Sequence, residues 1–180
     1  MSTDRLKALA SAIRRVIEPA MSAQQFKYDP ATRTFRKLSG TCTQIVNFQA
    51  GVRSMEGLFT VNLGVYHPEY RDSANYAPVS DHPKEYDCLV RARLSTLRDT
   101  PITRFFRPRI HSTDTFLKWW LVTADDKWWA FSEDEGQVER QLESLRGLLL
   151  STGLKWLERH SDPKLLKAEY DQRRPVPMGS

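Results

Sequence analysis

Several segments between residues 26 and 94 show the apolar and polar spacing of β-strands. In the clearest of them, residues 57–68, every second residue is apolar and most of the intervening ones are polar. This period of two is typical of a strand with one buried face. The apolar set is Phe59, Val61, Leu63 and Val65, and the opposite set is Thr60, Asn62, Gly64 and Tyr66.

The neighbouring segments predict further strands of the same sheet. Residues 26–38 predict a hairpin that turns at Asp29-Pro30, and residues 41–50 are rich in strand-forming residues. Residues 85–97 contain a second alternating run, and we expect it to form one strand. Its predicted apolar side holds Tyr86, Cys88, Val90, Ala92 and Leu94, and its other side holds Asp87, Leu89, Arg91 and Arg93.

Both ends of the chain have the spacing of amphipathic helices. Residues 3–21 predict a helix that Pro19 should kink or end. A second helix should follow the three adjacent acids of the run at 132–139, whose carboxylates suit the positive end of a helix dipole. Gly153 is predicted to stop that helix, and Ser161-Asp162-Pro163 should start another. The two apolar stripes are Leu6, Leu9, Ala10, Ile13, Ile17 and Met21, then Val138, Leu142, Leu145, Leu148 and Leu149.

Four of the five Trp residues occur as two Lys-Trp-Trp triplets between residues 118 and 129. The segments 116–123 and 127–131 are aromatic and prone to form strands, and the residues between them favour a turn. We therefore expect a hairpin in which one Trp of each pair points to each face of the sheet. A platform for stacking nucleic-acid bases is the alternative.

The order of helix, strands and helices predicts an α+β fold. We expect a mostly antiparallel sheet of about five or six strands, covered on one face by N- and C-terminal helices. A chain of 180 residues fits one domain, here residues 1–172, followed by a disordered tail at 173–180. The N-terminus lacks the apolar run of a signal peptide and no window is apolar enough to span a membrane, so we expect a cytoplasmic protein without membrane contact.

One face of the predicted sheet gathers polar side chains that can bind a ligand. If the apolar residues of each strand face the helices, amide and guanidinium groups point the other way, where they can hold an anionic or peptide ligand. An antiparallel sheet often has one solvated face, and that is the simpler interpretation. This set, here called the polar face, is Asn47, Gln49, Asn62, Tyr66, Arg91 and Arg93.

The sequence contains no recognisable catalytic or metal-binding motif. The four His residues lack the spacings of metal ligands, and the Gly residues form no phosphate-binding loop. Cys42 and Cys88 lie inside predicted strands, where reduced, buried thiols are expected. We therefore expect neither a metal nor a cofactor. An enzyme would need a pocket in which a group such as Asp87 or His67 has an unusual pKa.

The order of several motifs resembles a bacterial family, domain of unknown function 4304. The motifs are "FTVNLGVYHPEY", "EYDCLVRARL", "DKWWAF" and "GLKWLERH", preceded by Asn47-Phe48-Gln49. The resemblance covers roughly residues 5–170. It implies the fold described above, in which a short N-terminal helix leads to the sheet and the chain ends in helices. It implies no activity and assigns no catalytic residue.

These observations favour a non-enzymatic binding or interaction module that uses the polar face, with another protein or a small anionic ligand as its partner. The net charge of +5 raises nucleic-acid binding as the alternative. In that case Arg91 and Arg93 would act together with a basic loop at 104–111. The arginines of that loop are Arg104, Arg107 and Arg109.

Overall fold

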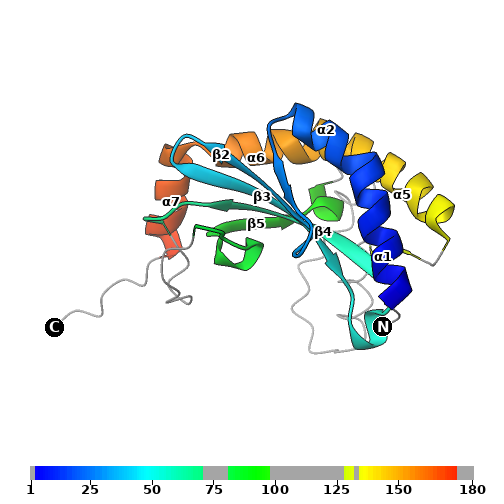
Figure 1. Cartoon of the computed structure of the whole chain (residues 1–180). Coiled ribbons are helices and arrows are strands. Elements are labelled where there is room, and N and C mark those ends of the chain that lie inside the picture. The colour runs from blue at the N-terminus through cyan, green and yellow to red at the C-terminus, as the bar shows by residue number, and fades with distance from the viewer. Residues whose placement is uncertain (1–2, 71–80, 98–127, 132–133, 174–180) are drawn as a thin grey trace, which may run out of the picture.

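The computed structural model describes residues 3–70, 81–97, 128–131 and 134–173, and within them the chain forms a six-stranded antiparallel sheet with helices on one side (Figure 1). This confirms the predicted α+β class. Strands β1 to β5 are neighbours in chain order, and β6 pairs with β4. The strands are β1 (Lys27–Asp29), β2 (Thr34–Ser39), β3 (Cys42–Ala50), β4 (Leu58–Tyr66), β5 (Val90–Arg93) and β6 (Trp129–Ala130).

Strand β4 is the centre of the sheet because it pairs with three other strands. One edge pairs with β3 along its length, from Ala50 opposite Phe59 to Thr43 opposite Tyr66. The other edge pairs with β6 at Leu58 and Phe59, and then with β5 from residue 62 to residue 65. The apolar set predicted for residues 57–68 lies in the main core: Phe59, Val61, Leu63 and Val65 are fully buried. The opposite set is less exposed than predicted, because Thr60 and Tyr66 are buried as well.

The first helix passes through Pro19 instead of ending there. It comprises α1 (Thr3–Ala12), a π-helical turn at Ile13–Ile17 and α2 (Glu18–Ala23). In the π-turn the Glu18 backbone N–H donates to the Ile13 carbonyl, five residues back. Pro19 has no N–H to donate, and a widened turn is a usual way to accommodate that loss. The predicted end of the helix is therefore replaced by a local change in winding.

The C-terminal helix also continues past its predicted stop at Gly153. It runs through α5 (Glu135–Leu148), a π-helical turn at Leu149–Gly153 and α6 (Leu154–His160), and Asp134 caps its start by accepting from the Gly136 and Gln137 N–H groups. Gly153 is buried, and a Cβ there would lie 3.0 Å from Leu94 Cδ1. Its role is close packing of the helix against Leu94, so the prediction of a stop is wrong.

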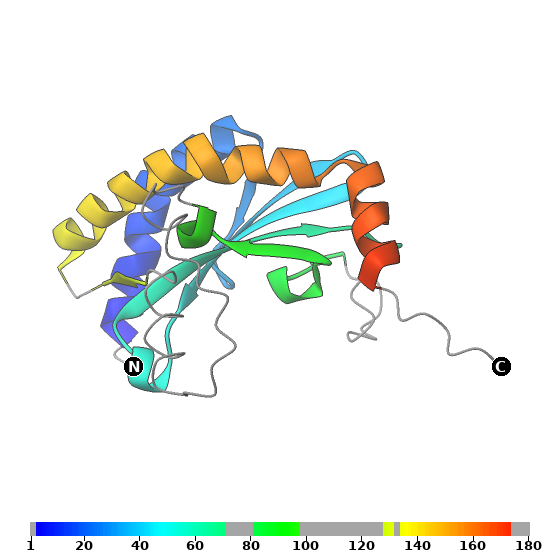
Figure 2. The same ribbon diagram turned by 180° about the vertical axis from the view of Figure 1, so that it is seen from behind.

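A third helix follows at the end of the sheet. Helix α7 (Pro163–Arg173) begins where the Ser-Asp-Pro motif predicts it, and Asp162 Oδ1 accepts from the Lys164 N–H. Figure 2 shows α7 turned away from α6, near the beginning of β5. Among the described residues, none of the helices is long and apolar enough to cross a bilayer.

On the helix-facing side of the sheet, aromatic side chains stack in a row that includes Trp129, a member of the one Trp pair that the structure describes. Phe59 stacks on Trp129 with 5.8 Å between ring centroids, and on Phe48 at 6.3 Å. The row continues through Phe35 to Tyr28, across β3, β2 and β1. Trp129 is buried, whereas Trp128 contacts the side chain of Arg93 on the opposite face. The partner strand predicted at 116–123 lies outside the described residues.

The strand predicted within residues 85–97 is shorter than its alternation suggests. Only Val90–Arg93 pair with β4, and the preceding Glu85–Asp87 form a 3-10 turn, η3. The turn interrupts the period of two, so Cys88 packs with Ile45 and Tyr66 and not in the main core. The prediction that Tyr86 and Cys88 share the helix-facing side with Val90 is therefore wrong.

Candidate ligand pocket on the polar face

The strand register places the polar side chains in rows across the sheet. In one row Thr34, Asn47, Asn62 and Arg93 are successive partners on β2, β3, β4 and β5. In the next row the partners are Arg36, Ile45, Gly64 and Arg91. Directly paired residues share a face. The predicted orientation of Asn47, Asn62, Arg91 and Arg93 away from the helices is therefore confirmed.

The segment that carries η3 crosses this face and is held there by two contacts. The backbone carbonyl of Pro83 accepts from Arg36 Nε at 2.9 Å. Cys88 sits over Gly64, where any larger side chain would have no room: a Cβ would lie 2.6 Å from Cys88 Sγ. Burial raises the pKa of the Cys88 thiol above its usual range, so it is a packed, protonated group. The segment thus separates a pocket on its β5 side from a groove on its β1 side.

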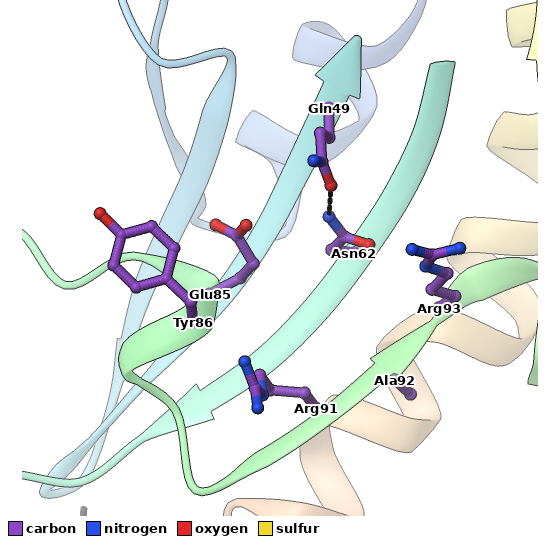
Figure 3. Close-up of a pocket in the computed structure, with 7 residues that line it drawn as sticks. All are labelled: Gln49, Asn62, Glu85, Tyr86, Arg91, Ala92 and Arg93. Carbon is purple, nitrogen blue, oxygen red and sulfur yellow. Dashed lines mark hydrogen bonds between the residues drawn. The ribbon is translucent and has the colours of Figure 1, made fainter. Parts of the chain in front are cut away.

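The pocket on the β5 side has a volume of about 330 Å³ and brings four of the six predicted residues together. Asn62 Nδ2 donates to Gln49 Oε1 at 2.7 Å, so this bond joins the ends of the two amides (Figure 3). The bond uses one donor and one acceptor, and it leaves the Gln49 amino group and Asn62 Oδ1 for other partners. The lining residues, here called the Arg91 pocket, are Gln49, Asn62, Glu85, Tyr86, Arg91, Ala92 and Arg93.

Charges of both signs face the Arg91 pocket from different elements. Arg91 is exposed on β5. The Cζ atom of Arg93 lies 5.3 Å from the ring centre of Trp128. Stacking on an aromatic ring is compatible with a guanidinium that also binds carboxylates or phosphates. Glu85 comes from η3 and its carboxylate points into the same space (Figure 3). No hydrogen bond or ion pair joins Glu85 to either of these two described arginines.

Two residues of the predicted polar face are not on its open surface. Asn47 is only 9% exposed, because its Nδ2 donates to the Thr32 carbonyl and to Thr34 Oγ1. Tyr66 is 4% exposed and packs with Cys88 beneath the η3 segment. The strand period gives the correct side of the sheet for both. It could not show that other segments of the chain cover them.

The sequence pattern did not indicate the groove on the other side of η3. This groove has a volume of about 600 Å³ and includes Leu38, whose side chain is 75% exposed. One of its lining residues is Asp29, which accepts a hydrogen bond from Thr32 Oγ1 and forms an ion pair with Arg36. The Thr32 bond, helped by the Arg36 bond and opposed by partial burial, lowers the pKa of Asp29. The lining residues are Gln25, Lys27, Tyr28, Asp29, Arg36, Lys37, Leu38, Thr43, Asp81 and His82.

The two groups considered for an enzyme have structural partners outside the Arg91 pocket. Asp87 Oδ2 accepts from the Lys84 backbone N–H at 2.8 Å and so caps η3. His67 Nδ1 accepts from the Glu69 N–H, which leaves Nε2 to donate to Thr41 Oγ1 when the ring is neutral. In the described part of the chain, no cluster of three His, Cys, Asp or Glu side chains could hold a metal ion.

The basic loop of the nucleic-acid alternative, with Arg104, Arg107 and Arg109, lies outside the described residues.

The sequence comparison agrees with the resemblance found in the motifs. The model of the family described as "Domain of unknown function (DUF4304)" matches residues 17–159, which is more than half of the chain. The chain belongs to this family. No curated protein and no solved structure gives a significant match. The DUF4304 match includes all the residues that line the Arg91 pocket.

Proposed function

We propose that this DUF4304 protein is a binding module whose Arg91 pocket holds an anionic group of its ligand. The observation that carries the proposal is that Arg91 and Arg93 line one pocket together with the amides of Gln49 and Asn62. Guanidinium groups bind carboxylates through paired, charge-assisted hydrogen bonds, and the amides add neutral ones. The carboxylate can belong to a small molecule or to an acidic side chain of another protein.

The rigidity of the pocket supports recognition rather than a merely solvated surface. Asn62, Arg91 and Arg93 are on strands that pair with each other, so the sheet sets the separations of their Cα atoms. The Gln49 amide is fixed by its bond to Asn62. Groups placed in advance lose less conformational entropy when a ligand binds.

Nucleic-acid binding is the second candidate, and the contact of Arg93 with Trp128 favours it because bases stack on such platforms. Glu85 argues against it, because its carboxylate faces the same pocket and repels a phosphate chain. The two candidates differ in their response to salt. Binding of an oligonucleotide should weaken steeply as salt rises, with a slope set by the number of phosphates contacted.

The proposal is tested by calorimetric titration with three carboxylate or control probes and with a single-stranded oligonucleotide. Glutarate represents a small dicarboxylate, a capped peptide with two Glu residues represents a protein segment, and the same peptide with Gln is its neutral counterpart. Both carboxylate probes should bind, the Gln peptide should not, and a single-stranded oligonucleotide should bind no more tightly than the Glu peptide at physiological salt.

The variant that removes the site is the double replacement of Arg91→Gln and Asn62→Ala. It should weaken carboxylate binding by at least about tenfold, the effect of losing one charge-assisted hydrogen bond. Arg140→Gln, on the exposed side of α5, is the matched control and should bind as the native protein does. Equal affinity of the native protein and the double variant would show that the polar face is only solvated surface.

A further inference from the structure

We infer that the ligand of the Arg91 pocket is a zwitterion, with its anionic group at Arg91 and Arg93 and an ammonium group at Glu85. This inference rests on the proposed function and specifies the chemical class of ligand. It starts from the arrangement of charges: one carboxylate and two guanidinium groups line the same pocket from separate elements.

The structure keeps these opposite charges apart. Arg91 and Arg93 are on β5, whereas Glu85 is on η3. The residues that flank η3 hold it in place, because Pro83 accepts from Arg36 and Cys88 packs on Gly64. Within the part of the chain that the structure describes, no ion pair joins Glu85 to Arg91 across the pocket. A ligand that carries both charges can satisfy both sides without moving either element.

The electrostatics favour a zwitterion over a ligand that carries only negative charge. An anion at Arg91 and Arg93 is attracted by them, but it is also repelled by the Glu85 carboxylate that faces the same space. An ammonium group on the ligand turns that repulsion into a charge-assisted hydrogen bond. Glu85 is partly buried, which makes solvent screening of this interaction weaker than on an open surface.

The neutral groups between the charges suit the middle of such a ligand. Asn62 Oδ1 accepts hydrogen bonds and the Gln49 amino group donates them, so the pocket offers both kinds of partner between its charged sides. A volume of about 330 Å³ accommodates a molecule of amino-acid size. The same chemistry could come from a Lys side chain and a nearby carboxylate in a peptide.

Matched probes isolate the contribution of the ammonium group. Butyrate and 4-aminobutyrate differ only by that group, as do hexanoate and 6-aminohexanoate, and the two chain lengths sample two separations of charge. A capped Lys-Ala-Glu peptide and a capped Ala-Ala-Glu peptide distinguish a protein source from a small molecule. Affinity is measured from amide chemical shifts of the isotope-labelled full chain.

At least one zwitterion should bind about tenfold more tightly than its anion-only counterpart, the ratio that one charge-assisted hydrogen bond supplies. In Glu85→Gln this ratio should fall to about one, whereas Glu158→Gln, on the exposed side of α6, should leave it unchanged. Anion-only binding should survive in Glu85→Gln and be lost when Arg91 is replaced.

Equal binding of each zwitterion and its counterpart would overturn the inference, and so would a preference that persists in Glu85→Gln. Either result leaves the proposed function intact, because binding of the anion-only probes does not require a contact with Glu85. If no probe of either kind binds, both the inference and the proposed carboxylate site are wrong. The peptide arm decides which source of the zwitterion the pocket accepts.

Discussion

The thiol of Cys88 occupies the space directly above Gly64, so that a Cβ on Gly64 would lie 2.6 Å from Cys88 Sγ and 3.1 Å from Cys88 Cβ. This contact joins the centre of β4 to the segment that supplies Glu85 and Tyr86. The glycine is needed for close approach and not for backbone freedom. One methyl group at this position should therefore move a wall of the Arg91 pocket.

We expect Gly64→Ala to destabilise the protein by about 1–3 kcal/mol, the usual cost of overpacking. It should also weaken ligand binding, because η3 cannot keep its position over the sheet. Chemical denaturation and the glutarate titration measure the two effects. Cys88→Gly in the same chain removes the clashing atoms and should recover part of both losses. Full stability and binding in Gly64→Ala alone would show that η3 is not held by this contact.

The adjacent residues Trp128 and Trp129 should differ sharply in their effect on stability. Trp129 is buried against Phe59, and its replacement by Ala should cost about 3–5 kcal/mol in the free energy of unfolding. Trp128→Ala should cost clearly less, because Trp128 lies outside that core and is partly exposed. Urea denaturation of both variants makes the comparison. Similar losses would contradict the opposite orientation of the two side chains.

Asp29 should make stability depend on pH. Its folded pKa is lowered, chiefly by the Thr32 hydrogen bond, so its stabilising effect is present above the unfolded pKa of about 3.9 and is lost as the pH falls through the folded value. Asp29→Asn should cost about 1 kcal/mol near pH 6, an estimate that allows for solvent screening. The difference between the native protein and Asp29→Asn should shrink below pH 4. Denaturation curves across this range would contradict the assignment if the difference stayed constant.

Both thiols should resist modification in the folded protein. Cys42 and Cys88 are free and buried, and burial raises the pKa of each, so little reactive thiolate is present near neutral pH. A colourimetric thiol reagent should react with neither at pH 7.5 and with both in denaturant. Rapid reaction of Cys88 in the folded protein would mean that η3 lifts off the sheet.

Where a strand keeps its regular period of two, the sequence correctly predicts which side of the sheet each residue faces. Val61 and Asn62 face opposite sides of β4, and the hairpin turns at Asp29-Pro30 as predicted. The errors occur where local geometry changes the period, as in the 3-10 turn before Cys88 and the π-turn at Gly153. The groove beside Leu38 has no periodic signal in the sequence, and Asp81 and His82 reach it from a segment distant from residues 25–43, which supply the rest of its lining.

The burial of Asn47 illustrates a second limit of the pattern. An alternating strand shows which side a residue faces, but its exposure depends on segments that pack over it later. The Thr32 carbonyl that covers Asn47 belongs to the turn between β1 and β2, fifteen residues away. Four of the six polar-face residues nevertheless meet in one pocket, because the strand register alone fixes their neighbours.

The most direct measurement is the response of side-chain nitrogen signals to glutarate in the isotope-labelled protein. We expect the NMR signals of the Asn62 and Gln49 side-chain amides and of the Arg91 and Arg93 Nε atoms to shift as glutarate is added. All four titration curves should give the same dissociation constant. The Asn62 and Gln49 shifts should disappear when both arginines are changed to Gln. If the largest shifts arise elsewhere on the protein, or if these four signals do not move, the Arg91 pocket does not bind an anionic ligand.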